Sequence, residues 1–228
     1  MGIEKAIAQS CNVTFYTLGL ELGADRIVNW ARKLGVGQPS GIDLPGEKTA
    51  FLPTQEWKER QLKEMWYPGD TINLSIGQGY LLVTPLEMYR VVSNIATRGE
   101  VYKPHVVKEI LNSKGEVIKK INPVLQNKIE LKDETWDTLV RGMEEVVNSG
   151  TGWACRGLPV KLAAKTGTAQ NPQGEDHSWF AGFFPSSHPQ VSFLVLIEHG
   201  GDGSGEAAQV AKKLVEWWEK ERKVKSEK

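Results

Sequence analysis

Apolar positions recur at the three- and four-residue spacing of helices in several parts of the chain. The clearest stripe runs from Trp136 to Val147 and ends at Ser149–Gly150. At Thr84–Glu87 the sequence is TPLE, in which Thr84 can cap a helix N-terminus and Glu87 can return a hydrogen bond to it. Helices are therefore expected over residues 3–9, 15–22, 24–34, 84–97, 136–147 and from 204 onward.

In the last third of the chain the spacing of apolar positions changes from the helical period to the two-residue period of strands. Strands are expected there at residues 160–169, 178–184 and 191–197. The last of these is apolar on both faces, which is typical of a strand in a sheet that is covered on both sides. Residues 185–190 form a short connection, so the last two strands should make an antiparallel hairpin.

Between these regions the pattern is weaker. Residues 35–82 are rich in Gly, Pro and polar side chains, and we expect loop with little regular structure there. A small β excursion is expected near residues 101–121, around a turn at Asn112–Gly115.

The pattern as a whole predicts an α+β fold, with an antiparallel sheet covered by helices and a mostly helical part beside it. Residues 1–158 are expected to form the mostly helical part. Residues 159–222 should carry the strands and C-terminal helix of the same domain, and residues 223–228 a charged, solvated tail. No repeat of fixed period occurs, which excludes solenoids and propellers.

Composition and charge mainly exclude classes of function. The chain has 28 Lys and Arg against 28 Asp and Glu, so no net field attracts nucleic acid or an anionic membrane. Cys11 and Cys155 lack the spacing of a zinc site and are too few for a disulfide framework, so no metal or cofactor is expected. The longest apolar run, Phe193–Ile197, is far shorter than a membrane span, and the N-terminus lacks the apolar core of a signal peptide. We therefore expect a soluble chain without a targeting segment.

The candidate chemistry centres on Lys165–Thr168, which reads KTGT. A phosphate-binding P-loop needs a glycine directly before the lysine and a helix after it, but Ala164 precedes Lys165 and Pro172 follows soon afterwards. On a strand, by contrast, Gly167 removes a side chain and lets another backbone approach. A peptide could then add along this strand, with Lys165 supplying positive charge for a carboxylate.

A second motif precedes this one, because Ser10–Asn12 reads SCN and matches S-x-N. S-x-N before K-T-G is the order found in serine acyl-transfer enzymes that recognise penicillin. The segments LGVGQPSGIDLPGE, GDTINLSIGQGYLLVTPLEM and AAKTGTAQ extend the match. On these residues the chain resembles the transpeptidase domain of class B penicillin-binding proteins, and most closely their elongation-type members, over all but the charged tail.

The resemblance implies a partial penicillin-binding, serine β-lactamase-like fold and a set of residue roles. It implies that Ser10 is a proton relay, that Asn12 is an amide donor that orients the substrate, and that Lys165 is the cation of the third motif. Thr166 would bind the substrate carboxylate with its hydroxyl. Gly167 and Thr168 would continue the substrate-binding strand, with the Thr168 N–H as half of an oxyanion hole.

The resemblance also implies substrates, partners and a location. The complete domain is expected to cross-link peptidoglycan stem peptides that end in D-Ala-D-Ala, and to bind β-lactams. A membrane protein that polymerises the cell wall is the expected partner. The parent protein is expected to be anchored in the bacterial inner membrane, with this domain in the periplasm or outside the cytoplasmic membrane.

The family's first motif, S-x-x-K, supplies the acylated serine, and no serine in this sequence has a lysine three positions later. The chain is therefore expected to be the C-terminal part of a transpeptidase domain whose nucleophile lies before Met1. Without nucleophile and base the covalent route is lost, so the chain alone is expected to be inactive.

Two other interpretations stay open. One is a serine hydrolase that uses Ser10 directly, although no positioned histidine supports it. The other is a non-catalytic peptide-binding or scaffold module that keeps the groove at Lys165. Asp176 and His177 lie close to the third motif in sequence, and no role follows from that. The chain has four histidines, which are scattered along it: His105, His177, His188 and His199.

Self-association is a further expectation. If the family's sheet order holds, the strand at residues 191–197 lacks a neighbour in this chain. An apolar strand edge of this kind favours pairing with another copy.

Overall fold

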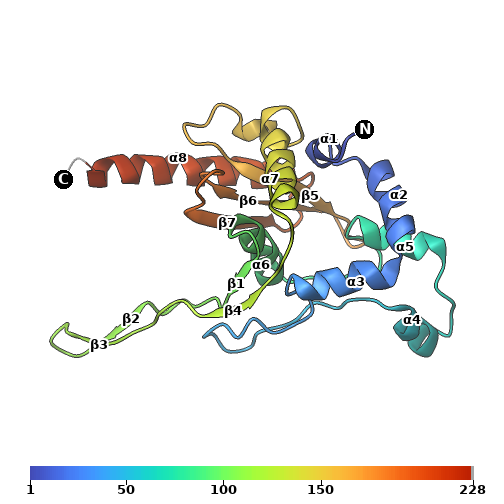
Figure 1. Ribbon diagram of the computed structural model, residues 1–228, viewed down its shortest axis with the longest axis horizontal. Coiled ribbons are helices and arrows are strands. Elements are labelled where there is room, and N and C mark those ends of the chain that lie inside the picture. Colours follow the sequence, from blue (N-terminus) through green and yellow to red (C-terminus); the bar gives the residue numbers. More distant parts are fainter. Residues whose placement is uncertain (227–228) are drawn as a thin grey trace.

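The structure is a computed structural model that describes residues 1–226 of the chain (Figure 1). The helices are α1 (Ile3–Ala8), α2 (Asn12–Leu22), α3 (Ala24–Lys33), α4 (Gln55–Leu62), α5 (Pro68–Ser75), α6 (Pro85–Ala96), α7 (Asp133–Asn148) and α8 (Glu206–Ser226), with a short 3-10 helix at Trp153–Cys155. The strands are β1 (Glu100–Tyr102), β2 (Glu109–Leu111), β3 (Val117–Lys120), β4 (Leu125–Lys128), β5 (Ala163–Ala169), β6 (His177–Phe184) and β7 (Val191–Ile197).

The main sheet has three antiparallel strands in the order β5-β6-β7. Lys165 lies opposite Ala181, and Phe180 lies opposite Val195. The three expected strands and the β6–β7 hairpin are therefore confirmed. In the described part of the chain β7 pairs with β6 alone, so it forms one edge of the sheet, while self-association through that edge stays a prediction.

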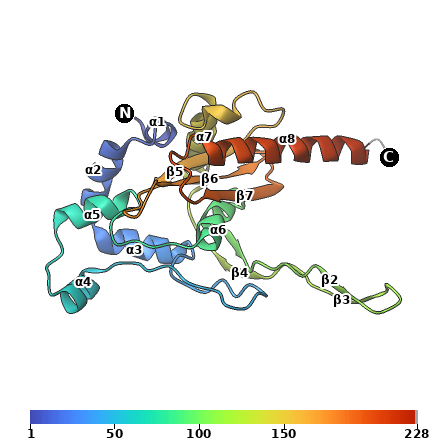
Figure 2. The same cartoon turned by 180° about the vertical axis from the view of Figure 1, so that it is seen from behind.

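Helices cover both faces of this sheet (Figures 1 and 2). On one face, Phe180, Phe184 and Phe193 pack against small residues of α8, with ring centroids of Phe180 and Phe193 6.1 Å apart. On the other face, Phe183 packs against Val92 of α6 and Met143 of α7. The alternation along each strand thus buries both faces, as the apolar pattern of residues 191–197 predicts.

The expectation of loop over residues 35–82 was wrong, because α4 and α5 lie within this segment. Both are short and carry few apolar residues, so periodicity alone does not reveal them. Tertiary contacts hold them instead: buried Lys58 of α4 donates to Asp70 of α5 at 2.8 Å. Trp57 of α4 lies between the rings of Phe51 and Tyr80.

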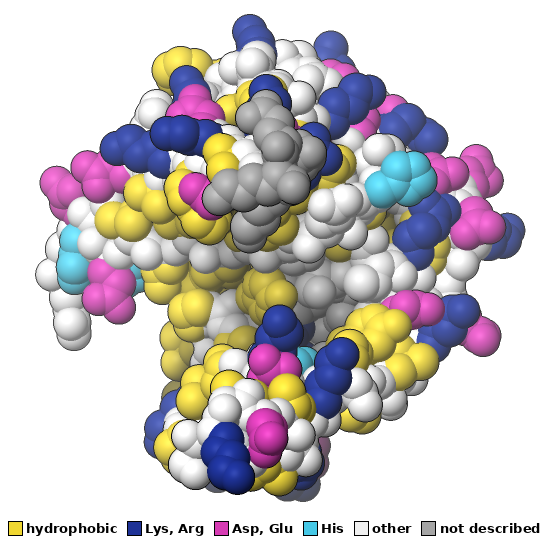
Figure 3. Space-filling view, turned by 90° about the vertical axis from the view of Figure 1, so that its left-hand side faces the viewer, with side chains coloured by type: hydrophobic (Ala, Val, Ile, Leu, Met, Phe, Trp, Pro, Cys, Tyr) yellow, Lys and Arg dark blue, Asp and Glu magenta, His cyan; other side chains and the backbone are white. Residues whose placement is uncertain are grey.

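The β excursion is larger than expected and forms an arm. β2 pairs with β3 around the expected turn, and β1 pairs with β4, a strand that the sequence pattern did not indicate. The arm projects from the body in Figure 1. Figure 3 shows a hollow between the arm and the part that carries α8, bordered largely by hydrophobic and uncharged side chains.

The C-terminal helix is also longer than expected. α8 continues to Ser226, so residues 223–226 are helical and not a tail, while residues 227 and 228 lie outside the described residues. The division of the chain at residue 158 stays a prediction. Among the described helices, none combines the length and the apolar character that crossing a bilayer requires.

The capping box at the start of α6 is present and also ties the preceding loop to the body. Thr84 Oγ1 accepts a hydrogen bond from the N–H of Glu87, and Glu87 Oε2 accepts one from the N–H of Thr84. The other carboxylate oxygen accepts from the N–H groups of Gly37 and Ala50, both at 2.8 Å. Glu87 is only 2% exposed, so these three backbone N–H groups depend on one buried carboxylate.

Replacing Glu87 by Ala should lower the free energy of unfolding by about 3 kcal/mol, because it removes the cap and leaves three partly buried N–H groups without their acceptor. Urea unfolding measures the loss. The matched control is Glu59→Ala, at an exposed helical glutamate of α4, which should change stability by less than about 0.5 kcal/mol. Equal losses in the two variants would contradict the role of Glu87.

Candidate functional site

Ser10 lies in the short link between α1 and α2, in a left-handed conformation with φ 49°. The link is held because α1 packs on α7, where Ile7 lies against Gly142. Gly150 permits this close packing, since a Cβ there would lie 2.0 Å from the carbonyl oxygen of Ala8. Gln9 adds a hydrogen bond from Nε2 to the carbonyl of Ser149. The position of Ser10 is therefore fixed by the contacts of α1 with α7 and with the residues directly after it, Ser149 and Gly150.

Lys165 extends from the middle of β5 to this link. Its ammonium donates to Ser10 Oγ at 2.8 Å and to the carbonyl oxygen of Thr166 at 2.9 Å. Two residues 155 positions apart in sequence thus meet in one hydrogen bond. Asn12, the first residue of α2, borders the same space.

Burial lowers the pKa of Lys165 from 10.5 to about 8. Removing the ammonium from water disfavours its charged form, so the proton is released more easily. A lysine with this pKa can hold or give up a proton near neutral pH, and a neighbouring hydroxyl can share in that transfer. The geometry and the pKa together are suited to proton movement between Lys165 and Ser10.

These residues line a cavity of about 480 Å³. All six residues singled out from the sequence border it, namely Ser10, Asn12, Lys165, Thr166, Gly167 and Thr168. The structure therefore brings the two motifs together, while the individual roles given to these residues stay predictions. The rest of the lining is formed by Phe15, Ser75, Ile76, Gln78, Thr151 and Asp202.

β5 has one paired and one free edge within the described chain, because only β6 pairs with it. The carbonyl of Thr166 accepts from Lys165, and the carbonyl of Thr168 accepts from Gln78 Nε2 at 3.0 Å, so both point away from β6. The N–H and C=O of one strand residue point to the same side. The N–H groups of Thr166 and Thr168 therefore point to the free edge as well, where an added peptide strand could use them.

Sequence reasoning missed Ser75 and three further polar residues of the lining. Thr151 Oγ1 lies 2.6 Å from Thr166 Oγ1, and Asp202 Oδ2 accepts from Thr168 Oγ1 at 3.4 Å. Hydrogen bonds from Ser204 keep the pKa of Asp202 below its ordinary value, so this carboxylate is charged. The third is Gln78. Its GQG setting lay within a segment that carries the family resemblance, which was the available signal.

The residues left without a role lie elsewhere. His177 Nδ1 accepts a hydrogen bond from the backbone N–H of His199, and Asp176 accepts one from the N–H of Asn171. Within the described residues, the cavity lining contains no histidine. The same residues also include no group of three or more His, Cys, Asp or Glu placed to hold a metal ion.

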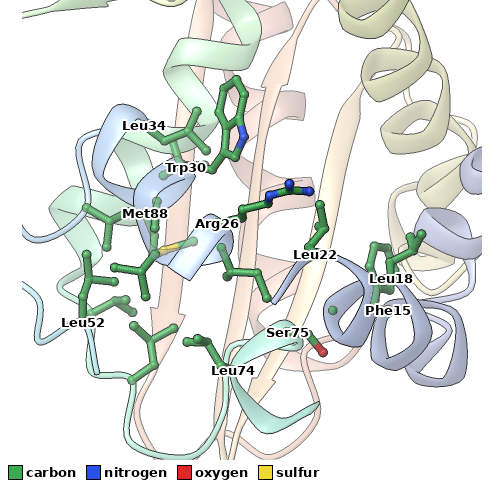
Figure 4. Close-up of a pocket in the computed structure, with 18 residues that line it drawn as sticks. Phe15, Leu18, Leu22, Arg26, Trp30, Leu34, Leu52, Leu74, Ser75 and Met88 are labelled. Atoms are coloured by element: carbon green, nitrogen blue, oxygen red, sulfur yellow. The ribbon is translucent and has the colours of Figure 1, made fainter. Parts of the chain in front are cut away.

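An apolar groove of about 550 Å³ adjoins the cavity and shares Phe15 and Ser75 with it (Figure 4). Leucines and other apolar side chains from α2, α3, α5 and α6 line it, including Leu22, Leu74 and Met88. Figure 4 shows these side chains converging from several elements on one space. An apolar surface of this size is typical of a place where another element packs.

Comparison with known proteins agrees with the geometry. The family model for the penicillin-binding protein transpeptidase domain matches residues 1–216. Peptidoglycan D,D-transpeptidase MrdA of Haemophilus influenzae is 34% identical over 246 residues, covering 99% of this chain and 37% of that protein. The MrdA of Escherichia coli K12 is 31% identical over 221 residues, covering 89% of this chain and 35% of that protein.

Solved structures show the same fold. Pseudomonas aeruginosa PBP2 in complex with WCK 5153 superposes with a TM-score of 0.83 at 35% identity, covering 96% of this chain and 47% of that one. Helicobacter pylori PBP2 in complex with MreC gives a TM-score of 0.80 at 31% identity, covering 98% of this chain and 40% of that one.

The chain belongs to the penicillin-binding protein transpeptidase domain family. Within that family it is of the elongation type, like MrdA and PBP2, which confirms the resemblance and the α+β transpeptidase fold. It spans a little over a third of the length of the curated relatives that it matches.

The lowered pKa of Lys165 predicts a pH-dependent stability. The folded chain releases this proton near pH 8 and the unfolded chain near pH 10.5, so between these values the unfolded state binds more protons and folding becomes more favourable as pH rises. Relative to Lys165→Met, the wild type should gain at most about 3 kcal/mol of unfolding free energy across this window.

Urea unfolding at several pH values measures this difference. The control is Lys161→Met, at an exposed lysine, which should follow the wild type throughout. If the unfolding free energies of the wild type and Lys165→Met changed in parallel from pH 8 to 10.5, Lys165 would not be desolvated in the folded chain.

Proposed function

We propose that this chain is the C-terminal part of a peptidoglycan D,D-transpeptidase domain, which cross-links stem peptides by acyl transfer through a serine. The observation that carries the proposal is the Lys165–Ser10 hydrogen bond at the free edge of β5. This contact joins the two motifs of the family in one cavity, with a lysine whose pKa of about 8 suits proton transfer.

A stem peptide ending in D-Ala-D-Ala would lie along the free edge of β5 as an added strand. Its terminal carboxylate would meet Lys165 and the hydroxyl of Thr166, because charge-assisted hydrogen bonds suit a carboxylate. Asn12, which borders the same cavity, would orient the peptide with its side-chain amide. The Thr168 N–H would donate to the oxygen that becomes negative when the peptide carbonyl is attacked.

Under this proposal the attacking serine comes from outside this sequence, since no S-x-x-K occurs in it. The apolar groove beside the cavity supports this part of the proposal. A segment packed there would end next to Phe15 and Ser75, which border both spaces, and would bring its side chains close to Lys165. We therefore propose that the complete protein supplies the nucleophile on a segment that fills the groove.

The proposed partners follow from the relatives. One PBP2 structure is a complex with MreC, and another relative was solved in a peptidoglycan synthase complex that coordinates polymerisation and cross-linking. We propose that the complete protein acts with a cell-wall polymerising membrane partner. Its place would be the bacterial inner membrane, with this domain outside the cytoplasm. β-Lactams are proposed as ligands of the complete domain.

A second candidate is a serine hydrolase in which Ser10 itself is the nucleophile. One observation favours it, because Lys165 lies 2.8 Å from Ser10 and serine–lysine pairs are known to replace the histidine of the common triad. The family resemblance favours a relay role instead. The third interpretation, a peptide-binding module without chemistry, would use the same cleft.

One experiment separates the transpeptidase proposal from the hydrolase. The purified chain is incubated with a fluorescent penicillin, and its intact mass is measured. We expect no stable adduct, because the acylated serine is absent. The same chain should bind diacetyl-L-Lys-D-Ala-D-Ala reversibly, and Lys165→Ala should weaken that binding by at least about tenfold through loss of a charge-assisted contact.

An adduct on Ser10 that disappears in Ser10→Ala would support the hydrolase and contradict the transpeptidase proposal. Covalent trapping elsewhere in the chain would contradict both. Peptide binding that is unchanged in Lys165→Ala would show that the cleft at β5 is not the binding site.

A further inference from the structure

The carbonyl of Thr168 is occupied although it lies on the edge of β5 that a peptide would use. Gln78 Nε2 donates to it at 3.0 Å, across 90 residues of sequence. Gln78 also borders the cavity that contains Lys165 and Thr166. The contact is therefore part of the cleft and not a distant support of the strand.

A peptide that pairs antiparallel with β5 needs the Thr168 carbonyl as the acceptor for one of its own N–H groups. In a hydrogen-bonded pair of an antiparallel ladder, the two facing residues exchange both N–H···O=C bonds. The substrate residue opposite Thr168 would accept from the Thr168 N–H and donate its own N–H to the Thr168 carbonyl. Under the proposed function, that residue is the one whose carbonyl is attacked, so its N–H competes directly with the side chain of Gln78.

The position of Gln78 is set by the turn that follows α5. Gly77 and Gly79 flank it with φ of 77° and 76°, a left-handed conformation that favours glycine. The Gln78 N–H donates to the carbonyl of Asn73 at 2.9 Å, which closes the turn on the helix. The backbone is thus fixed, while the half-buried side chain reaches β5 through rotatable bonds.

We propose that Gln78 competes with the peptide and sets its affinity, because its side-chain amide occupies the Thr168 carbonyl in the empty cleft and is displaced by the backbone N–H of the peptide. The inference rests on the proposed function and adds a residue to it. A ligand with an N–H at this position replaces one donor by another at little cost. A ligand without that N–H leaves the carbonyl unpaired, which disfavours it.

The test compares the affinity of diacetyl-L-Lys-D-Ala-D-Ala for the wild type, Gln78→Met and two controls. Methionine keeps the approximate size of glutamine but has no donor, so Gln78→Met should bind the peptide about fivefold more tightly, the equivalent of one modest hydrogen bond no longer broken. Gln126→Met is the matched control, because Gln126 Nε2 donates to the carbonyl of Ser40 at 2.9 Å away from the cavity. Its affinity for the peptide should equal that of the wild type.

Lys165→Ala tests the proposed function in the same titration. Loss of binding in Lys165→Ala together with equal or weaker binding in Gln78→Met would overturn this inference alone. Absence of peptide binding in the wild type and in Gln78→Met would overturn the proposed function and the inference with it.

Nuclear magnetic resonance on the wild type gives a second readout that needs no variant. In the free chain, the side-chain amide protons of Gln78 should exchange slowly with water. When the peptide is added, they should exchange faster while the Thr168 N–H becomes protected. A Gln78 amide that keeps its protection in the peptide complex would overturn the inference.

Discussion

The hydrogen bond between Lys165 and Ser10 is the contact on which the rest of the site depends. It joins residues 155 positions apart, so it exists only if α1 is docked on α7 and β5 is in its place in the sheet. Each of these conditions is met by packing away from the site. Gly150 lets α1 approach α7, and Phe183 packs with Met143 where the sheet meets the same helix. The packing of the hydrophobic core thus sets the positions of the Ser10 and Lys165 side chains.

The same contact gives the cleft its chemical character. Burial next to Ser10 lowers the pKa of Lys165 to about 8, which places a group that can release its proton near neutral pH beside the free edge of a strand. Along that edge the carbonyls of Thr166 and Thr168 are already bound by Lys165 and Gln78, whereas their N–H groups point to the cleft. An edge that offers donors is suited to the carbonyl oxygens of a peptide, and to the negative charge that forms when one of them is attacked.

The sequence predicted the elements that are stabilised by neighbouring residues, or whose apolar positions repeat with a clear helical or strand period. The TPLE capping box, the apolar stripe of α7 and the strands β5 to β7 are of this kind, and each was found. α4 and α5 were missed because contacts such as Lys58–Asp70 stabilise them. The sequence of a polar eight-residue segment does not reveal which distant residues it will contact. The C-terminal end of α8 was missed because charged residues extend the helix into a segment that resembles a solvated tail.

The residues of the site likewise fall into those that the sequence revealed and those that it did not. The S-x-N and K-T-G motifs could be found because spacing and order carry the family resemblance, and the structure brings their residues together. Thr151 and Asp202 reach the cavity from two other turns of the chain, and nothing in their local sequence says that these turns meet. The apolar groove could not be predicted either, because its lining comes from four helices and the loops between them and becomes continuous only after folding (Figure 4).

A double-mutant cycle on Ser10 and Lys165 tests the central claim most directly. The free energy of unfolding is measured for the wild type, Ser10→Ala, Lys165→Met and the double variant at neutral pH. Residues that share a hydrogen bond should show a favourable coupling of about 1 kcal/mol. The control pair, Ser10→Ala with Lys161→Met, should show none. A coupling of zero between Ser10 and Lys165 would mean that the two motifs do not meet in the folded chain, and would contradict the account.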